Sequence, residues 1–483
     1  MENIANKDEL LYLRIAKSLE HQIKNGVLKM GDKLPSIRAI CYEHGVSMST
    51  ALRAYYDLES KSLIESRPQS GYYVAYSHKQ FPATPSTSNP KNTDVRETEE
   101  DIITLVFSEL GIKNNILFSL GVPGTELLPL PKLNKAMVQA MRELKGNGTD
   151  YEHIQGSLKL RRQVARLSFS WEGKLKEDDI ITTTGCINAL SYCMMSLVEK
   201  GDTIVVESPV FFGILQLARS LGLKVLELPT NATTGIELEA LKKAVEKQKV
   251  KLCLLISNFN NPLGSCMPNE HKKEVVKLME KHNIPLIEDD MYGDVYFGNQ
   301  RPKSCKTYDE SGIVLWCSSV SKTLAPGYRV GWVAPGKFKE KVLRNKVYHS
   351  ISSTTLTQEA IGIFLENGRY ENHLRKLRQK LHINYLLYLR VISESFPKDS
   401  KVSRPQGGFI LWVELNKNID TMELYKEAIK HKISIAPGRM FTLQKQYTNC
   451  IRLSYGLNWN EQINNGLKLI GKLAKILLQK HST

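Results

Sequence analysis

Residues 316–334 read Trp316-Cys-Ser-Ser-Val-Ser-Lys322-Thr-Leu-Ala-Pro-Gly-Tyr-Arg329-Val-Gly-Trp-Val-Ala334. They continue an apolar run, residues 312–317, that predicts a β-strand, and they place a lysine among hydroxyl residues with an arginine seven positions later. Hydroxyl groups and a guanidinium suit a phosphate group, and a lysine in a dry pocket suits a Schiff base. We therefore predict that Lys322 binds pyridoxal phosphate, although Lys322 taken alone would fit an ordinary surface lysine better.

Apolar runs alternate with helical patterns around this stretch. The helical patterns include residues 237–248 and 269–282, where apolar residues recur at helical spacing. Such alternation predicts a mainly parallel sheet covered by helices, in which ligand-binding groups collect at the C-terminal ends of the strands. The strands are expected at residues 203–206, 224–228, 251–257, 284–288, 312–317 and 330–334.

Several predicted strand ends carry a side chain that pyridoxal phosphate requires. The ring nitrogen of this cofactor needs a carboxylate, which Asp289 offers, and its ring oxygen needs donors, which Asn261 and Tyr292 offer. Phe211 is an aromatic residue that can cover the ring. Each residue also has a plainer interpretation, as a helix cap, a turn or a core residue. Their order at successive strand ends favours one shared site.

A second group of residues suits the phosphate of the cofactor. Backbone N–H groups at a helix start bind phosphate, and Thr184-Gly-Cys-Ile-Asn-Ala189 opens a predicted helix after residues 180–183, which resemble a strand. Hydroxyl groups and a cation would complete the site, although Arg329 alone would also fit a surface ion pair. The residues predicted to hold the phosphate are Gly185, Cys186, Ile187, Ser319, Ser321 and Arg329.

These blocks resemble the fold-type I aminotransferases over about residues 116–460. The most specific matches are Asn261-Pro-Leu-Gly264, Asp289-Asp-Met-Tyr292, Ser319-Val-Ser-Lys322 and Ile451-Arg452-Leu-Ser454. The resemblance implies that Arg452 binds a substrate carboxylate and that Gly121 leaves room beside the substrate. It also implies that Tyr151 reaches the phosphate in the partner subunit, and therefore a homodimer. One departure is Ile187, where relatives often carry glutamine; its contact would come from the backbone N–H.

The first 80 residues follow another pattern. Residues 9–25 predict an amphipathic helix, a second helix lies between Ser36 and Gly45, a third follows, and residues 63–74 predict two strands around a polar turn. Three helices and a hairpin predict a winged helix-turn-helix, although a helical bundle for protein contact fits too. Hydroxyl and arginine side chains there suit base edges and phosphates. The residues expected to contact DNA are Ser36, Arg38, Ser47, Ser49, Thr50, Arg53 and, at the hairpin tip, Arg67.

This region resembles the GntR-type DNA-binding domain. The matches are Leu34-Pro-Ser-Ile-Arg38, Val46-Ser47, Tyr55, Leu58 and Gly71, and the departures are Met48 for arginine and Ser62 for glycine. Both resemblances in one chain identify it as a member of the MocR-type subgroup of GntR regulators. That resemblance implies a dimeric transcription regulator whose aminotransferase-like domain senses an effector.

We expect three parts in the chain. Residues 1–76 would be the mostly helical winged helix-turn-helix and residues 77–110 a linker rich in proline, serine, threonine and asparagine. Residues 111–483 would form an α/β pyridoxal-phosphate-binding domain with a mainly parallel sheet and a smaller C-terminal α+β part. The predicted function is a pyridoxal-phosphate-dependent, DNA-binding transcription regulator that senses an amino compound, or the cofactor itself, by Schiff-base chemistry at Lys322.

The alternative function is an active class I/II-type aminotransferase that moves an amino group from an amino acid to a 2-oxo acid. Lys322, Asp289, Tyr292 and Arg452 are all present, so the sequence permits this catalysis. The sequence leaves open whether several rounds of amino transfer occur.

The composition sets further expectations. The 483 residues carry a formal charge of +16, which suits a polyanionic partner such as operator DNA. Residues 1–80 hold 11 lysines and arginines against 9 acidic residues, so a bound nucleic acid would also meet positive charge in the later part of the chain. Eight cysteines without a Cys-x-x-Cys pair predict reduced thiols in the cytoplasm and no metal site. No uncharged apolar run reaches 18 residues, so no membrane span is expected.

Overall fold

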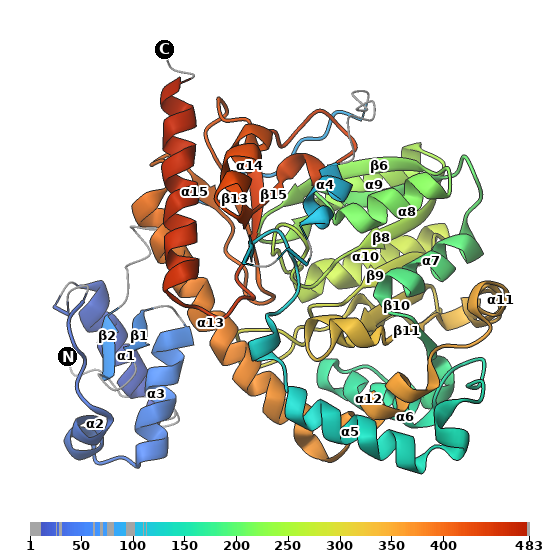
Figure 1. The fold of residues 1–483 in the computed structure, drawn as a ribbon, viewed down its shortest axis with the longest axis horizontal. Coiled ribbons are helices and arrows are strands. Elements are labelled where there is room, and N and C mark those ends of the chain that lie inside the picture. Colours follow the sequence, from blue (N-terminus) through green and yellow to red (C-terminus); the bar gives the residue numbers. More distant parts are fainter. Residues whose placement is uncertain are drawn as a thin grey trace, which may run out of the picture. The chain divides into compact units, whose positions relative to one another are not determined.

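The computed structural model describes residues 11–25, 27–28, 31–60, 63–67, 71–74, 82–92, 102–109, 111–112 and 114–480, except the side chains of Lys24, Ser60, Arg67 and Asn367. The chain divides into two compact units. One consists of Met1–Pro82 with Tyr385–Glu394, and the other of Ala83–Asn384 with Ser395–Thr483. Figure 1 shows the elements of both units, coloured along the sequence.

The first unit contains the predicted winged helix-turn-helix. Its helices are α1 (Leu11–Lys24), α2 (Ile37–His44) and α3 (Met48–Ser60), and β1 (Ile64–Arg67) pairs antiparallel with β2 (Gly71–Val74). Ser36 begins α2, because its Oγ accepts a hydrogen bond from the N–H of Ala39 (3.1 Å). Gly45 ends α2 in the left-handed conformation (φ 60°). Leu19, Tyr55 and Leu58 are buried in the shared core.

An eight-stranded sheet forms the centre of the second unit. Strands β10, β9, β8, β5 and β6 are mutually parallel neighbours, whereas β4, β11 and β7 pair antiparallel. The predicted mainly parallel sheet is therefore confirmed. In sheet order the strands are β4 (Ile181–Thr183), β11 (Gly331–Ala334), β10 (Val314–Ser319), β9 (Leu286–Asp289), β8 (Val250–Leu255), β5 (Thr203–Ser208), β6 (Lys224–Asn231) and β7 (Gly235–Ile236).

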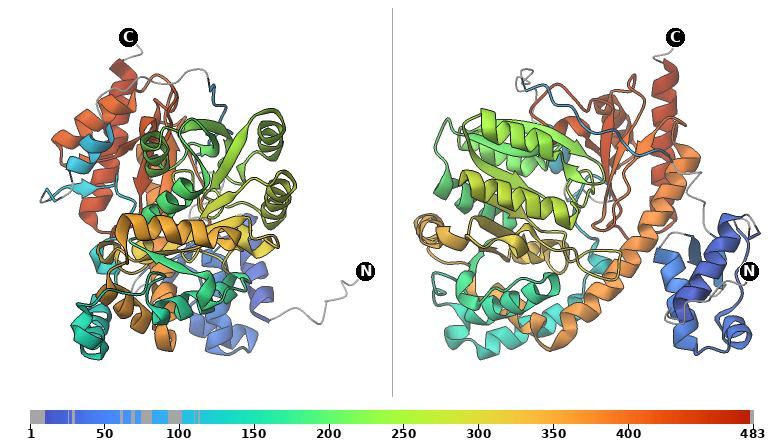
Figure 2. Two further views of the ribbon diagram at one scale, coloured as in Figure 1. Left: turned by 90° about the vertical axis from the view of Figure 1, so that its right-hand side faces the viewer. Right: turned by 180° about the vertical axis from the view of Figure 1, so that it is seen from behind.

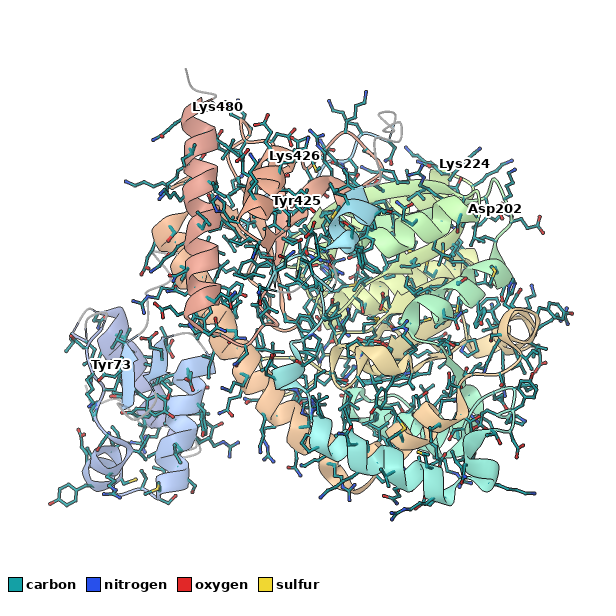
Figure 3. The ribbon with its side chains drawn as sticks, viewed as in Figure 1. Tyr73, Asp202, Lys224, Tyr425, Lys426 and Lys480 are labelled. Carbon is teal, nitrogen blue, oxygen red and sulfur yellow. The ribbon has the colours of Figure 1, made fainter. Side chains whose placement is uncertain are left out.

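Helices cover both faces of this sheet, as Figure 2 shows from two further sides. Successive residues of a strand point to opposite faces, so Val206 joins one core and Val205 the other. The first core is closed by α7 (Cys186–Leu197), α8 (Phe212–Ser220) and α11 (Lys339–Ser350), and the second by α9 (Leu238–Lys247) and α10 (Asn269–His282). At the N-terminal ends of β5 and β6, the N–H of Lys224 donates to the backbone oxygen of Asp202 (2.8 Å; both labelled in Figure 3).

The remaining elements of the second unit include the predicted smaller α+β part. Its antiparallel sheet has the order β12-β13-β16-β15, and β3 pairs parallel with β14. No helix in the described part of the chain is long and apolar enough to cross a membrane. The remaining α-helices and strands are α4 (Ile102–Ser108), β3 (Ile116–Leu117), α5 (Leu130–Glu143), α6 (Leu158–Ser168), α12 (Thr355–Leu365), α13 (Arg369–Ser395, of which Tyr385–Glu394 belongs to the first unit), β12 (Lys401–Val402), β13 (Ile410–Glu414), α14 (Thr421–Lys430), β14 (Ile433–Ser434), β15 (Ala436–Pro437), β16 (Cys450–Ser454) and α15 (Glu461–Lys480).

Part of the expected linker is bound to the second unit. The N–H of Ser88 donates to the backbone oxygen of Thr230 (3.1 Å), and Nδ2 of Asn92 donates to that of Glu227 (3.0 Å). Helix α4 also lies within the expected linker. Residues 75–81 and 93–101 lie outside the described residues, and the domain boundaries remain a prediction.

Candidate functional site

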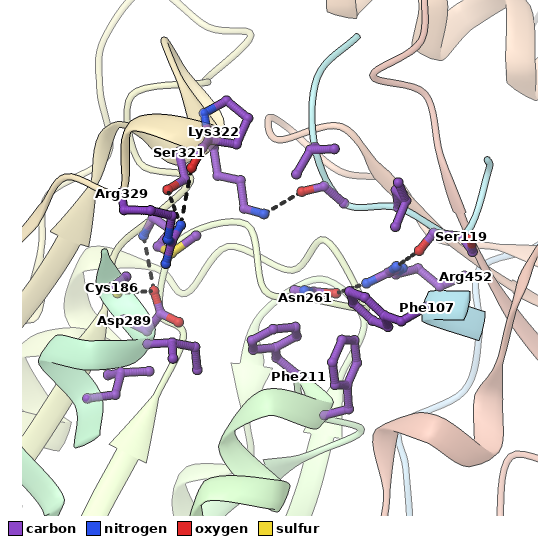
Figure 4. Close-up of a pocket in the computed structure, with 18 residues that line it drawn as sticks. Phe107, Ser119, Cys186, Phe211, Asn261, Asp289, Ser321, Lys322, Arg329 and Arg452 are labelled. Carbon is purple, nitrogen blue, oxygen red and sulfur yellow. Dashed lines mark hydrogen bonds between the residues drawn. The ribbon is translucent and has the colours of Figure 1, made fainter. Parts of the chain in front are cut away.

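A cavity of about 310 Å³ opens at the C-terminal edge of the parallel strands (Figure 4). It gathers most of the residues predicted for cofactor and substrate binding. Those that line it are Gly121, Cys186, Ile187, Phe211, Asn261, Asp289, Ser321, Lys322, Arg329 and Arg452. The topology explains this convergence, because parallel strands bring residues far apart in sequence to one edge of the sheet.

Lys322 ends the short helix η7 (Val320–Lys322), which follows β10. Its Nζ donates a hydrogen bond to the backbone oxygen of Gly121 and lies 5.7 Å from the centre of the Tyr292 ring. Burial, with a smaller effect of the Arg452 guanidinium, lowers the pKa of Lys322 to about 8, and Asp289 opposes the shift. The lysine therefore has an accessible neutral amine near neutral pH, which is the form that attacks an aldehyde.

Asp289 ends β9 and faces the same cavity. Burial raises its pKa to about 6, while hydrogen bonds from Cys186 and Met291 lower it, so the carboxylate remains mostly ionised at pH 7. Both donors reach Oδ1, the Cys186 thiol at 3.5 Å and the Met291 N–H at 3.3 Å. Burial also raises the pKa of the Cys186 thiol well above its usual range, so the thiol stays protonated. The sequence predicted only a backbone contact for Cys186, and its side-chain contact with Asp289 was missed.

The start of α7 and Arg329 form a cradle that suits a phosphate group. Gly185 precedes the helix with φ 88°, and a Cβ built on it would lie 2.3 Å from Nη2 of Arg329. Only glycine fits this approach without displacing the arginine. Arg329 Nη1 is 3.5 Å from the Ser321 hydroxyl oxygen, and Nη2 donates to the backbone oxygen of Thr184 (3.2 Å). Helix-start N–H groups, a hydroxyl and a guanidinium thus meet at one end of the cavity.

Polar groups at the other end of the cavity are not all paired. Nη1 of Arg452 donates to Oδ1 of Asn261 (3.2 Å), and Nη2 donates to the backbone oxygen of Ser119. The Tyr292 hydroxyl and Nε of Arg452 are buried, and neither has a hydrogen-bond partner among the described residues. Burial lowers the pKa of Arg452 to about 10, with Tyr292 opposing the shift. Buried polar groups without partners point to a ligand that would satisfy them.

Four predicted residues do not line the cavity. Tyr292 lies beside it, since a Cβ on Gly121 would be 3.4 Å from the Tyr292 hydroxyl. The Ser319 hydroxyl accepts a hydrogen bond from the N–H of Ser321 (3.2 Å) and supports the loop. Gly185 does not line the cavity, but it leaves room for the Arg329 guanidinium beside the start of α7. Tyr151 is 82% exposed and does not line the cavity of its own chain.

The structure also adds residues that the sequence did not indicate. Phe107 of α4 lines the cavity and packs edge-on against Phe212, with ring centres 5.5 Å apart. The apolar run of residues 102–107 was a usable signal, but it lies in a segment assigned to the linker. Further lining residues are Ser119, Leu120, Val122, Leu190, Phe212, Met291 and Pro326.

The predicted DNA-contacting residues lie at the start of α2, at α3 and in β1 of the first unit. Arg38, Ser47, Ser49 and Arg53 are exposed, and Arg53 lies over the Tyr12 ring, 4.4 Å from its centre. The Ser47 hydroxyl accepts a hydrogen bond from the N–H of Thr50 (3.2 Å), which orders the start of α3. Ser36 is also exposed and caps α2, and the side chain of Arg67 lies outside the described part of the chain.

Comparison with known proteins covers both units. Residues 113–469 match the family "Aminotransferase class I and II", and residues 11–74 match "Bacterial regulatory proteins, gntR family". The HTH-type transcriptional regulator YjiR of Escherichia coli (strain K12) is 37% identical over 95% of this chain and 98% of its own. The HTH-type transcriptional regulator NorG of Staphylococcus aureus (strain USA300) is 28% identical over 90% of this chain and 98% of its own.

Solved structures agree with the fold of the second unit. LysN, an α-aminoadipate aminotransferase of Thermus thermophilus complexed with N-(5'-phosphopyridoxyl)-L-leucine, superposes with a TM-score of 0.73 at 26% identity and covers 79% of this chain and 96% of its own. The multiple substrate aminotransferase of Thermococcus profundus has the same fold (TM-score 0.73, 23% identity, 79% and 96% covered). The chain therefore belongs to the MocR-type GntR regulators, in which a helix-turn-helix domain is joined to a class I and II aminotransferase domain.

Proposed function

We propose that this regulator binds pyridoxal phosphate at Lys322 and changes its hold on DNA when an amino compound, or the cofactor itself, occupies the site. The observation that carries the proposal is the partly buried Lys322, whose pKa is lowered and which lines one cavity together with Asp289 and Arg329. LysN, which shares the fold, was solved with a phosphopyridoxyl ligand.

Each end of the cavity would hold one part of the cofactor. The cofactor supplies an aldehyde that condenses with amines and a ring that withdraws electrons. The backbone N–H groups of Cys186 and Ile187 would bind its phosphate together with Arg329, supported by Ser321 and Ser319. Asp289 would keep the ring nitrogen protonated, because a carboxylate ionised at pH 7 favours the positive charge. Phe211 would cover the ring, and Asn261 and Tyr292 would donate to its oxygen.

The remaining groups suit an amino-acid-like effector. Arg452 can bind a carboxylate as a fork, and its unpaired Nε and the shifted pKa of its guanidinium show that its neighbours do not neutralise it. Gly121 leaves space beside Tyr292 and Arg452. An effector changes DNA affinity only if it binds the two states of the protein differently, so the signal depends on that difference in affinity.

The assembly that we propose is a cytoplasmic homodimer on operator DNA. Tyr151 is exposed and does not line the cavity of its own chain, and it would reach the phosphate of the partner subunit. Arg38, Ser47, Ser49, Thr50 and Arg53 would contact DNA together with Ser36 and Arg67. Multiple-turnover amino transfer is not the favoured function, because the relatives that match the whole chain are named as transcriptional regulators.

A gel-shift experiment with DNA from upstream of the protein's own gene tests this function. We expect binding that changes when pyridoxal phosphate or an amino acid is added. Arg38→Ala and Arg53→Ala should abolish DNA binding and leave the cofactor absorbance intact, whereas Lys322→Ala should abolish the absorbance and the effector response. Absence of DNA binding under every cofactor condition would contradict the proposal.

A further inference from the structure

A second cavity in the aminotransferase-like unit has no role in the proposed function. It measures about 450 Å³ and shares no lining residue with the candidate cofactor cavity. Its walls come from the start of α5 and the segment before it, from α13, and from Asn458 after β16. We call it the α5–α13 cavity. Its volume lies in the range of roughly 300–1,000 Å³ that small-molecule sites occupy.

Positive charge converges on this cavity. Lys132 of α5 faces it from one wall, and Lys376 and Lys380 of α13 from another, whereas Glu126 is the acidic residue in its lining. Lys376 and Lys380 are four positions apart, so they share one face of the helix and repel each other. Within the described ranges, none of the three lysines takes part in an ion pair, whereas Arg378 of the same helix pairs with Glu371 (2.8 Å).

A buried histidine connects the cavity to the cofactor-binding segment. His373 lines the cavity, is 9% exposed, and its Nε2 lies 2.7 Å from the backbone oxygen of Thr323. Burial lowers the pKa of His373, and the positive charge of Lys132 adds to this effect against the hydrogen bond with Thr323. Thr323 directly follows Lys322, so one hydrogen bond links a wall of this cavity to the residue next to the candidate cofactor lysine.

We propose that the α5–α13 cavity binds a small molecule that carries two phosphate or carboxylate groups. Three ammonium groups against one carboxylate leave an excess of positive charge that two anionic groups would neutralise. Leu127, Pro129 and Leu377 provide apolar contacts for the part between these groups. The concave shape favours a small molecule over duplex DNA, whose phosphates lie on a convex surface and would meet only the exposed lysines at the rim.

Calorimetric titration of the full chain with pyrophosphate tests this site. We expect saturable binding that weakens roughly tenfold or more in Lys376→Ala/Lys380→Ala, since each lysine contributes a charge-assisted contact. The matched control is Lys273→Ala/Lys277→Ala, an exposed pair with the same spacing on α10, which should change the affinity less than about twofold. Arg329→Ala removes the phosphate cradle of the cofactor site and should leave pyrophosphate binding at the α5–α13 cavity in place.

Three outcomes would overturn the proposal. One is the absence of saturable pyrophosphate binding, and another is an equal loss in the α13 and α10 variants. The third is that Lys376→Ala/Lys380→Ala leaves the pyrophosphate affinity unchanged but weakens the salt dependence of DNA binding. The slope of log K against log salt concentration would then become shallower by about 0.9 per lost phosphate contact, which would show that the two lysines bind DNA alone. Because the pyrophosphate measurement needs neither DNA nor cofactor, its failure is distinct from failure of the proposed regulator function.

Discussion

The neutral thiol of Cys186 contacts the carboxylate of Asp289 in the candidate site, and this contact affects the pKa of Asp289. The thiol donates to Oδ1 of Asp289 at 3.5 Å, and burial keeps the thiol protonated. A hydrogen bond to the ionised form of a carboxyl lowers its pKa. Cys186 therefore offsets part of the effect of burial on Asp289, whose pKa is about 6.

Cys186→Ala should raise the pKa of Asp289, because the carboxylate loses one of its two donors to Oδ1. We expect a rise of up to about one unit, equivalent to roughly 1.4 kcal/mol, so a larger fraction of Asp289 would be protonated between pH 6 and 7. Carbon-13 NMR of the Asp289 carboxyl group in the cofactor-free protein measures this, with Asp289→Asn to assign the signal. Cys186→Ser keeps a donor and should restore the wild-type titration; identical curves for Ala and Ser would refute the role.

Gly185→Ala should weaken pyridoxal phosphate binding by at least roughly tenfold, since the new Cβ displaces the Arg329 guanidinium. The backbone conformation of Gly185 (φ 88°, ψ 169°) would by itself also cost an alanine about 1–3 kcal/mol of stability. Gly201→Ala is the matched control, because Gly201 has φ 92° and nothing within 4 Å of the added Cβ. Fluorescence titration with the cofactor and thermal unfolding should show similar stability losses but lost affinity only in Gly185→Ala.

At the scale of elements, residues 82–92 connect the linker to the sheet. Asn92 exchanges two hydrogen bonds with the backbone of Glu227 (3.0 and 3.1 Å) and accepts a third from Gln444 (2.7 Å). Glu227 lies on β6, and Gln444 follows β15, so one asparagine joins the large sheet to the smaller C-terminal part. A movement between these two parts would therefore strain or break the hydrogen bonds of Asn92 and shift the linker segment.

Asn92→Ala should detach residues 82–92 from the sheet and weaken the coupling between effector binding and DNA affinity. Three lost hydrogen bonds, at about 1 kcal/mol each, would speed amide exchange in residues 82–92 by roughly a hundredfold. We expect unchanged cofactor absorbance and a smaller effector-dependent change in DNA affinity. Asn89→Ala in the same segment is the control, because no hydrogen bond of the Asn89 side chain is among the described contacts. Equal exchange in both variants would argue against the role of Asn92.

The sequence predicted the elements better than it predicted their contacts. Residues 203–206 and 312–317 were expected as strands and lie in or next to β5 and β10, because buried parallel strands are continuous apolar runs. The gathering of site residues followed from the strand order. The contact of the Cys186 thiol with Asp289 and the hydrogen bonds of Asn92 could not be predicted, since both depend on packing between distant segments. Phe107 was missed because its short helix lies among polar residues.

At the scale of the whole molecule, the exposed position of Tyr151 bears on how two chains associate. It is 82% exposed, and Ile154, three positions later, is 40% exposed. The Thr355 hydroxyl donates to the backbone oxygen of Asp150 (3.1 Å), which holds the Tyr151 segment beside the start of α12. Ile351, four positions before Thr355, is 53% exposed. Exposed tyrosine and isoleucine side chains suit a subunit contact, so this surface is where we expect the second copy of the chain.

Co-expression of Lys322→Ala and Tyr151→Phe chains tests whether Tyr151 acts across that contact. Each variant alone should bind pyridoxal phosphate weakly or without a covalent bond. In a mixed dimer, the site with the intact Lys322 receives the intact Tyr151 of the other chain, so it is wild type, while the second site carries both changes. We expect mixed dimers, isolated by two different affinity tags, to regain about half of the wild-type high-affinity cofactor binding in an absorbance titration, because one of two sites is restored. If Tyr151 served its own chain, no site in the mixed dimer would be intact and no binding would return.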